Sequence, residues 1–599
     1  MAKESKFKNL VNNAYAVKTV WNISPSRVVH MMVGAAQGYA GWLFFSIAFL
    51  RYIINAIQNE APFGTIMAFI GISCAAFGAF YMLNNYQEAY VFPFTDNLIY
   101  RKLYEKLYAK ARNVELRCFE DAEFYNRYTM ALDDAPNRMT TSVHCFFQIS
   151  FGVAAAVAAF YAIFRIDAYS VLFVIAPVVG NFVLGGMMNK LYGKRYQDSV
   201  KHFRAMSYVN RVMYLAEFAK EIRFSNVFGL MMGRSRSAVK GLQKVTGDYA
   251  PKMVVYNWIK NAAVFTLPFE GVMIYAAYRT IVSRTMNLAD LAIMLSAMTT
   301  FSWILIGLVD NVLNALKNGV FLEYFRGFME YEEKIAEDQD GIMPERSIRE
   351  IEFRNVGFAY GNNTPVVKNL SFSISGNEVA ALVGHNGAGK TTIIKLLFRL
   401  YDPTEGEILV NGINVKEYNV KAYRKMFAAA FQDYKVMSMP IRDNVAMGAE
   451  IDGEAVENAL RRAGVWEKVS SLPKGMDTVL TKEFEEDGAV LSGGEYQKII
   501  VARAFAQNAP VKVFDEPSSA LDPIAEYDLY KSIMEESVGK TTIFISHRLS
   551  SVKDADKVFM LENGEIIERG THKELMALGG AYCEMFTKQA QNYMLGGAK

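Results

Sequence analysis

Residues that bind metals or form cross-links are scarce in this sequence. Its 599 residues include four cysteines and six histidines. Cys74, Cys118, Cys145 and Cys583 form no CxxC pair, and the histidines form no HxxxH cluster. This spacing gives no metal-ligand pattern and predicts free thiols.

A strong charge imbalance and a cleavable leader are also missing. The net charge of +3 is too small to indicate nucleic acid as a partner. The first apolar run starts near Val28, is too long for a signal peptide and is followed by no small-residue cleavage site. We therefore expect no signal peptide.

Charge is nearly absent from six long apolar segments in the first half. About 20 apolar residues in a helix span the hydrocarbon core of a bilayer, and buried helices of soluble proteins are rarely uncharged for so long. The sequence therefore predicts an all-α transmembrane domain of six helices. The predicted spans are residues 28–50, 61–87, 139–164, 168–189, 261–278 and 291–309.

Lysine and arginine are concentrated in the two long loops that follow the second and fourth spans. Positive charge near helix ends favours the cytoplasmic side, so these loops and both termini should face the cytoplasm. Apolar residues at helical spacing, such as Leu103, Leu107 and Ala111, predict that the membrane helices continue beyond the bilayer. Residues 1–27 form either an amphipathic lead-in along the inner membrane surface or a disordered tail.

Glu270 is an ionisable residue inside a predicted span, two residues after Pro268. A charge at that depth is costly, which makes Glu270 a candidate for a substrate cavity. The alternative is a structural carboxylate that pairs with another helix.

The second half begins near Ile348 with short β-branched strands, turns and helices, as in a soluble α/β domain. Residues 384–391 match GxxxxGK[ST] in full, after the apolar strand 379–383 and at the start of a helix. Backbone N–H groups and the helix N-terminus would bind phosphates, Lys390 would neutralise their charge, and Thr391 would ligate Mg²⁺. The predicted nucleotide-binding residues here are Gly384, His385, Asn386, Gly387, Ala388, Gly389, Lys390, Thr391 and Thr392.

A second motif distinguishes among the families that share this loop. Its five residues are Leu491, Ser492, Gly493, Gly494 and Glu495. Ser492 and Glu495 form a capping box, which predicts a helix start with exposed amides. The motif precedes an apolar segment that ends in Asp515 and Glu516. One of these carboxylates suits a Mg²⁺ site and the other a general base for water.

With both motifs in this order behind a six-helix domain, the chain resembles an ABC-type exporter half-transporter over nearly its whole length. The resemblance implies an α/β P-loop NTPase cassette that uses ATP and Mg²⁺. It also implies roles for further residues: Tyr360 would stack on adenine, Gln432 would touch Mg²⁺ and take part in catalysis, and Asp515 would bind Mg²⁺. Glu516 would polarise the attacking water, and His547 would contact the γ-phosphate. The loop that crosses between cassettes would be Ser519, Ala520, Leu521 and Asp522.

Three features depart from the family's usual pattern. Glu495 replaces a commoner glutamine, and the segment 481–488 is unusually acidic. Lys512 interrupts the apolar strand before Asp515, and we expect it on the less buried side of that strand. None of these departures removes a catalytic group.

The resemblance also implies a dimer, because two cassettes of this family enclose two ATP molecules between them. Residues 491–495 would then bind the nucleotide held by a second half-transporter. Coupling helices are expected near residues 117–125 and 223–229. The stretches 119–126 and 219–223 resemble bacterial exporters often found in pairs, which favours a heterodimer, although the intact motifs also permit a homodimer.

We therefore predict an ATP-hydrolysing exporter in a bacterial plasma membrane, with its cassette and both termini in the cytoplasm. Its partners would be a second half-transporter, membrane lipid and a transported peptide, lipid or drug-like molecule. The competing hypothesis is a ligand-sensing membrane ATPase with a regulatory role. The predicted divisions are a lead-in (1–27), a transmembrane domain (28–329), a linker (330–347), a nucleotide-binding domain (348–588) and a tail (589–599).

Overall fold

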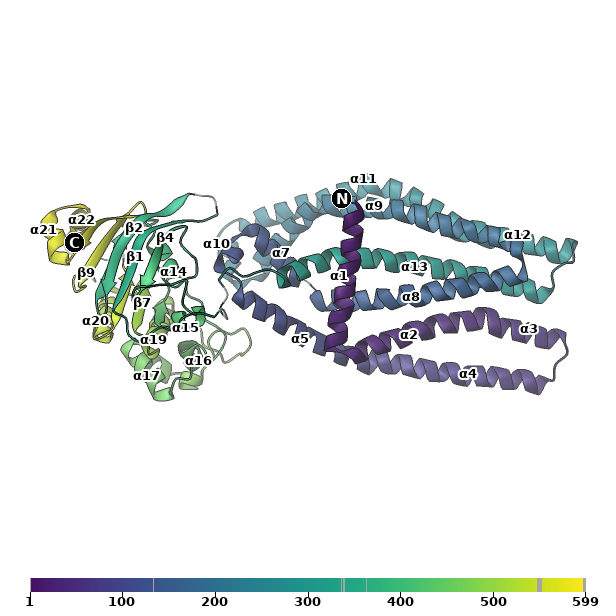
Figure 1. The fold of residues 1–599 in the computed structure, drawn as a ribbon, viewed down its shortest axis with the longest axis horizontal. Coiled ribbons are helices and arrows are strands. Elements are labelled where there is room, and N and C mark those ends of the chain that lie inside the picture. The colour runs from purple at the N-terminus through teal and green to yellow at the C-terminus, as the bar shows by residue number, and fades with distance from the viewer. Residues whose placement is uncertain are drawn as a thin grey trace. The chain divides into compact units, whose positions relative to one another are not determined.

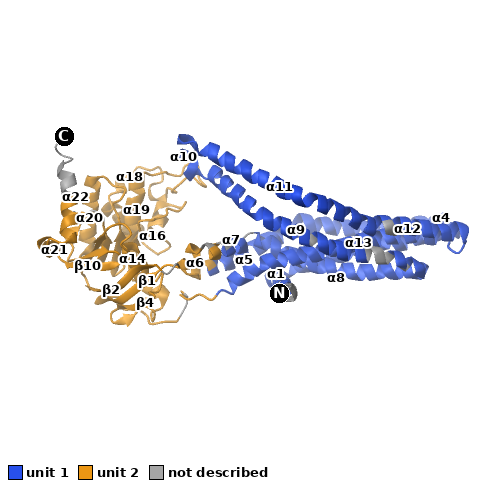
Figure 2. Cartoon of the chain, turned by 90° about the horizontal axis from the view of Figure 1, so that it is seen from above, with its two compact units in different colours: residues 1–110, 126–331 blue, residues 111–125, 332–599 orange. Residues whose placement is uncertain are grey.

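The computed structural model describes residues 2–132, 134–335, 337, 340–361, 364–546 and 552–595. Figure 2 shows its two compact units: Met1–Lys110 with Asn126–Tyr331, and Ala111–Tyr125 with Glu332–Lys599. The second unit therefore includes a short segment that lies far upstream of the cassette in sequence. The four cysteines, all of them described, are outside disulfide bonds, as predicted.

Six long helical rods form most of the first unit (Figure 1). Several are continuous through π-helical turns, labelled η. In chain order the rods are α2–η1–α3 (Pro25–Leu43, Phe44–Phe49, Leu50–Gln58), α4–η2–α5 (Phe63–Tyr86, Gln87–Val91, Phe92–Asn113), α8 (Ala135–Ile166), α9 (Val171–Tyr214), α11–η5–α12–η6 (Val227–Asn261, Ala262–Thr266, Leu267–Ala277, Tyr278–Val282) and α13 (Leu288–Met329). The remaining helices of this unit include α1 (Ala2–Ile23), α10 (Ala219–Phe224) and the larger part of α7 (Ala122–Leu132), whose first residues belong to the second unit.

Each predicted span falls within one of these rods, apart from a few terminal residues. Among the described residues, four helices are long and apolar enough to cross a membrane: Pro25–Gln58, Phe63–Asn113, Ala135–Ile166 and Leu288–Met329. The second and fourth rods run well past spans 61–87 and 168–189, so the predicted extension of these helices is confirmed.

Helix α1 packs across the long rods α8 and α13. A glycine makes this crossing close: a Cβ added at Gly319 of α13 would lie 2.8 Å from Cβ of Asn9. The Asn12 side-chain amide donates to the Gly319 carbonyl at 3.0 Å. The N-terminal helix is thus fixed to the helical unit by backbone contact as well as by apolar packing.

The second unit contains two sheets (Figure 1). One is antiparallel with strand order β2-β1-β4-β5, and the other has order β10-β9-β3-β8-β7-β6 and is parallel except for β10. The strands are β1 (Glu350–Ala359), β2 (Pro365–Ser375), β3 (Val379–Gly384), β4 (Glu405–Val410), β5 (Ile413–Asn414), β6 (Phe427–Ala430), β7 (Val511–Asp515), β8 (Thr541–Ile545), β9 (Lys557–Glu562) and β10 (Glu565–Gly570). The helices are α6 (Leu116–Glu120), α14 (Lys390–Leu397), α15 (Val420–Arg424), α16 (Ile441–Ala446), α17 (Gly453–Arg462), α18 (Trp466–Ser470), α19 (Gly493–Ala506), α20 (Pro523–Ser537), α21 (His572–Leu578) and α22 (Ala581–Leu595).

Strand β7 contributes side chains to two hydrophobic cores, one on each face of the parallel sheet. Val511 and Val513 belong to the core shared with the antiparallel sheet, and Phe514 belongs to the core under the helices. The expectation that Lys512 lies on a less buried side is therefore wrong, because Lys512 is fully buried. A central strand of a parallel sheet is covered on both faces, so it has no exposed side.

Candidate nucleotide site

The phosphate-binding loop joins β3 to α14. Gly384, Gly387 and Gly389 have positive φ angles of 149°, 83° and 99°. A Cβ at Gly384 would lie 2.3 Å from the Leu561 carbonyl oxygen, so this position requires glycine. The Lys390 ammonium is buried and donates to the carbonyls of Gly384 at 2.8 Å and His385 at 3.0 Å. A cation and a helix N-terminus thus converge on one loop, which suits a phosphate chain.

Asp515 ends strand β7 with its carboxylate buried beside this loop. Burial raises the pKa of Asp515 to about 6, although a hydrogen bond with Thr391 and the charge of Lys390 act in the opposite direction. Its Oδ1 atom is buried and has no hydrogen-bond partner among the residues that the structure describes. A divalent cation would supply the missing partner and favour the ionised carboxylate, so Asp515 and Thr391 fit a Mg²⁺ ion.

Glu516 follows at the tight turn after β7. Its φ of 51° lies in the left-handed region, and its backbone N–H donates to the Ile545 carbonyl at 3.1 Å. The Gln432 amide donates to Glu516 Oε2 at 2.8 Å. The structure therefore brings together Gln432 and Glu516, which are 84 residues apart in sequence. His547 lies outside the described residues.

The second motif begins α19 as predicted. Ser492 is the N-cap and forms a full capping box with Glu495. Gly494 lies against the next loop, because a Cβ there would come within 3.1 Å of the Ala520 carbonyl oxygen. At the end of that loop, the Asp522 carboxylate accepts from the backbone N–H groups of Ile524 and Ala525 and caps α20. The loop 519–522 is thus held at both ends.

Gln497 is a residue of this site that the sequence analysis missed. Its side chain is buried and donates to the Glu516 carbonyl and the Ser519 hydroxyl, each at 3.0 Å. Its Oε1 accepts from the Ala520 N–H at 2.8 Å. The signal available in the sequence was position alone: Gln497 follows Ser492 by five residues, in the second turn of the predicted helix. Gln497 connects the helix of the second motif to the turn that carries Glu516.

Tyr360 lies after β1, close to the phosphate-loop helix. Its hydroxyl is 3.3 Å from the Thr392 hydroxyl, and its ring meets the Tyr401 ring edge-on at a centroid distance of 5.4 Å. The Lys395 ammonium lies 5.6 Å from the centre of the Tyr360 ring. The ring therefore stands close to the helix that follows the phosphate loop, and its stacking on adenine stays a prediction.

The upstream segment 111–125 contacts the cassette near Tyr360. Glu120 of α6 pairs with Lys395 at 3.1 Å and accepts a hydrogen bond from the Tyr401 hydroxyl. Leu116 packs against the core shared by the two sheets. The predicted coupling region 117–125 is thus attached to residues that adjoin Tyr360. The second predicted region, 223–229, includes the end of α10 and the start of α11 in the first unit.

Glu270 lies in the first turn of α12 and is exposed in the single chain. Among the hydrogen bonds and ion pairs of the described residues, none involves Glu270, so the alternative of a paired structural carboxylate gains no support within this chain. Nearby methionines divide into two groups: Met294 and Met298 are buried in a helical core, whereas Met273 is exposed.

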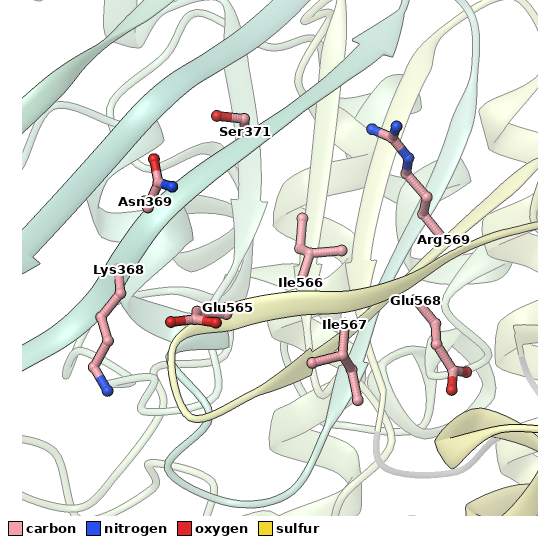
Figure 3. Close-up of a pocket in the computed structure, with 8 residues that line it drawn as sticks. All are labelled: Lys368, Asn369, Ser371, Glu565, Ile566, Ile567, Glu568 and Arg569. Carbon is pink, nitrogen blue, oxygen red and sulfur yellow. The ribbon is translucent and has the colours of Figure 1, made fainter.

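A separate hollow of about 470 Å³ lies between the edge strands β2 and β10 (Figure 3). Its lining is mostly polar and includes Lys368, Glu565 and Arg569. It shares no residue with the predicted nucleotide site.

Comparisons with known proteins identify the family of the chain. Residues 367–519 match the family model described as ABC transporter. The ATP-dependent lipid A-core flippase of Haemophilus influenzae is 31% identical over 432 residues, which are 70% of each chain. The chain therefore belongs to the family of ABC-type exporters, in which a transmembrane domain is fused to a nucleotide-binding domain. It is a multi-pass membrane protein with an ATP-binding cassette.

Other relatives match over shorter segments. The flippase of Paraburkholderia xenovorans is 38% identical over 261 residues, 43% of each chain. The mitochondrial iron-sulfur clusters transporter ATM1 of Saccharomyces cerevisiae is 32% identical over 398 residues, 65% of this chain and 54% of that protein. These matches thus span about half the length of those two relatives.

A solved structure supports the fold across nearly the whole chain. A bacterial Atm1-family ABC exporter with ATP bound matches with a TM-score of 0.77 at 24% identity, over 95% of this chain and 99% of that one. The predicted fold class, an all-α transmembrane domain of six helices followed by an α/β cassette, is confirmed.

Proposed function

We propose that this chain is one half of a dimeric primary active exporter that hydrolyses ATP to move a substrate out of the cytoplasm or across leaflets. The observation that carries the proposal is the end of β7. Asp515 is a buried carboxylate, and its Oδ1 has no hydrogen-bond partner in the described part of the chain. It is followed directly by a second carboxylate, Glu516, which is hydrogen-bonded to Gln432. Hydrolysis of a γ-phosphate requires both a metal site and a group that orients water.

The residues of this site would have different roles, which follow from the chemistry of their side chains. Residues 384–389 and the N-terminus of α14 would bind the phosphates, while Tyr360 would stack on the adenine. Thr391, Gln432 and Asp515 would hold Mg²⁺, which neutralises charge on the phosphates when bound. Lys390 would exchange its present carbonyl partners for phosphate oxygens. Glu516 would accept a proton from water, and His547 would contact the γ-phosphate.

A second chain would complete each site. Ser492, the N-cap of α19, and the amides at the start of this helix would bind the phosphates of a nucleotide held by the other chain. The partner half-transporter would supply the nucleotide for it, either as an identical chain or as a related one. Closure on ATP and reopening after hydrolysis would drive the helical unit.

The substrate would be a peptide, a lipid or a drug-like molecule, and Glu270 is our candidate for contact with it. The flippase relative supports an exporter of this class in a bacterial plasma membrane. The lysine- and arginine-rich loops support a cytoplasmic position for the cassette and both termini.

The test is uptake into inside-out vesicles against a panel of these substrate classes, with Glu516→Gln as the control. We expect ATP-dependent uptake that the substitution lowers by at least about 10²-fold, as for loss of a catalytic base. Uptake that survives Glu516→Gln would refute the mechanism. Ligand-stimulated ATPase activity without any uptake would support a regulatory sensor instead.

A further inference from the structure

Lys512 is a buried lysine that the catalytic roles above do not use. It lies in β7 between Ala428 of β6 and Thr542 of β8 and is 0% exposed. The salt bridges formed by the described residues do not include it. A lysine buried without a carboxylate is costly, and apolar residues of similar size are usually more stable in such places.

The partners of Lys512 are two backbone carbonyls at the end of α19. Its ammonium donates to the carbonyl oxygens of Ala504 and Gln507. Gln507 is the C-cap of this helix. The last carbonyls of a helix have no partner within the helix, and the helix dipole favours a positive charge there. Lys512 therefore caps α19 from a neighbouring strand.

The two ends of α19 serve different parts of the proposed site. Ser492, at its start, would contact the nucleotide of the partner chain. Gln497, one turn further on, is bonded to the backbone of Glu516. Lys512, at the far end, is three residues before Asp515 on the same strand. The helix is thus attached at two points, to β7, which ends in Asp515, and to the following turn, which carries Glu516.

We propose that Lys512 is a positioning residue, which holds α19 on β7. The second motif, which serves one site, and the carboxylates, which serve the other, then keep a fixed distance and orientation. This inference rests on the proposed function. It predicts that the lysine is retained at a cost in stability because the alignment of the two sites depends on it.

Burial and nearby positive charges make the attachment of Lys512 to α19 sensitive to pH. Arg462 of α17 and Lys540, which precedes β8, both pair with Glu536 of α20. Burial is the main cause that lowers the pKa of Lys512 to about 7, and the positive charges of Lys540 and Arg462 lower it further. A rise in pH through 7 would therefore neutralise the ammonium and weaken its bonds to α19.

Lys512→Met in the purified, lipid-reconstituted transporter is the direct test. Methionine has a similar length but donates no hydrogen bond. We expect an equal or higher thermal midpoint, binding of a fluorescent ATP analogue within about twofold of wild type, and ATPase kcat lowered by about tenfold, as for a small misplacement of reacting groups. Lys540→Met is the matched control, since it removes a nearby lysine that makes no bond to α19.

A second variant separates positioning from folding. Lys512→Arg keeps the charge and the donors and should recover kcat to within about threefold of wild type. We expect the ATPase activity of wild type to decline above pH 7 as Lys512 loses its proton. The activity of Lys512→Arg should show no such decline, because arginine stays protonated. If Lys512→Met does not fold, this pH comparison carries the test.

Three results would overturn the proposal: Lys512→Met with wild-type kcat, a loss of activity that only parallels a lower thermal midpoint and weaker analogue binding, or identical pH profiles of wild type and Lys512→Arg. Failure of the proposed function is seen separately, as wild-type protein that hydrolyses no ATP. The positioning role can then still be tested by measuring ATP-dependent closure of the dimer. The two proteins compared have lysine or methionine at position 512, both in a Glu516→Gln background.

Discussion

Removal of the Gln497 side chain should damage the catalytic turn and the stability of the cassette together. Gln497→Ala loses three buried hydrogen bonds, to the Glu516 carbonyl, the Ser519 hydroxyl and the Ala520 N–H. At about 1 kcal/mol for each bond, the loss is about 3 kcal/mol. In a domain of this size, that lowers the unfolding midpoint by roughly 6–12 °C.

The assay is differential scanning calorimetry of the full chain together with its ATPase rate. Glu516 loses one of the bonds that fix its backbone, so we expect kcat to fall by at least about tenfold below the unfolding temperature. Lys498→Ala is the matched control, because the next side chain bonds to the Gly464 carbonyl in a different part of the cassette. A Gln497→Ala protein with the midpoint and kcat of wild type would refute this reasoning.

Two further predictions concern the carboxylates. Asp515→Asn should raise the thermal midpoint of the nucleotide-free protein at pH 7.5 and abolish ATPase activity. The pKa of Asp515 in the folded protein, about 6, exceeds its value in the unfolded chain, so the ionised carboxylate destabilises the fold. This cost is absent below about pH 4, grows as the pH rises, and is complete above pH 6, where it is about 3 kcal/mol. Unchanged midpoints at pH 7.5 would contradict it. Glu120→Ala removes an ion pair with Lys395 and a hydrogen bond from Tyr401. Basal ATPase activity should persist, while the stimulation of this activity by substrate should fall. Unchanged stimulation in the variant would show that segment 111–125 does not transmit the signal.

Contiguous motifs explain why much of the cassette could be predicted from sequence. The phosphate loop and the capping box of Ser492 and Glu495 are local, so their backbone geometry follows from neighbouring residues. The long helices were predictable for the same reason, since apolar periodicity continues past each membrane span.

Contacts between distant residues were not predictable in the same way. Gln497 acquires its role by meeting a turn that starts 19 residues later. Lys512 was misjudged because the strand sequence shows alternation but not what covers each face. The π-helical turns that continue several rods carry no sequence signal of their own. The attachment of Glu120 to Lys395 likewise depends on how the chain folds back.

The membership of segment 111–125 in the cassette unit has a consequence for synthesis. Glu120 and Lys395 are 275 residues apart in sequence. At about 5–20 residues per second, the ribosome needs roughly 14–55 s to make the second after the first. Over that interval Leu116 lacks the core on which it finally packs. We therefore expect chaperones or the membrane surface to protect this short helix in the nascent chain. A cassette expressed alone from residue 332 would lack segment 111–125, which is part of its own compact unit.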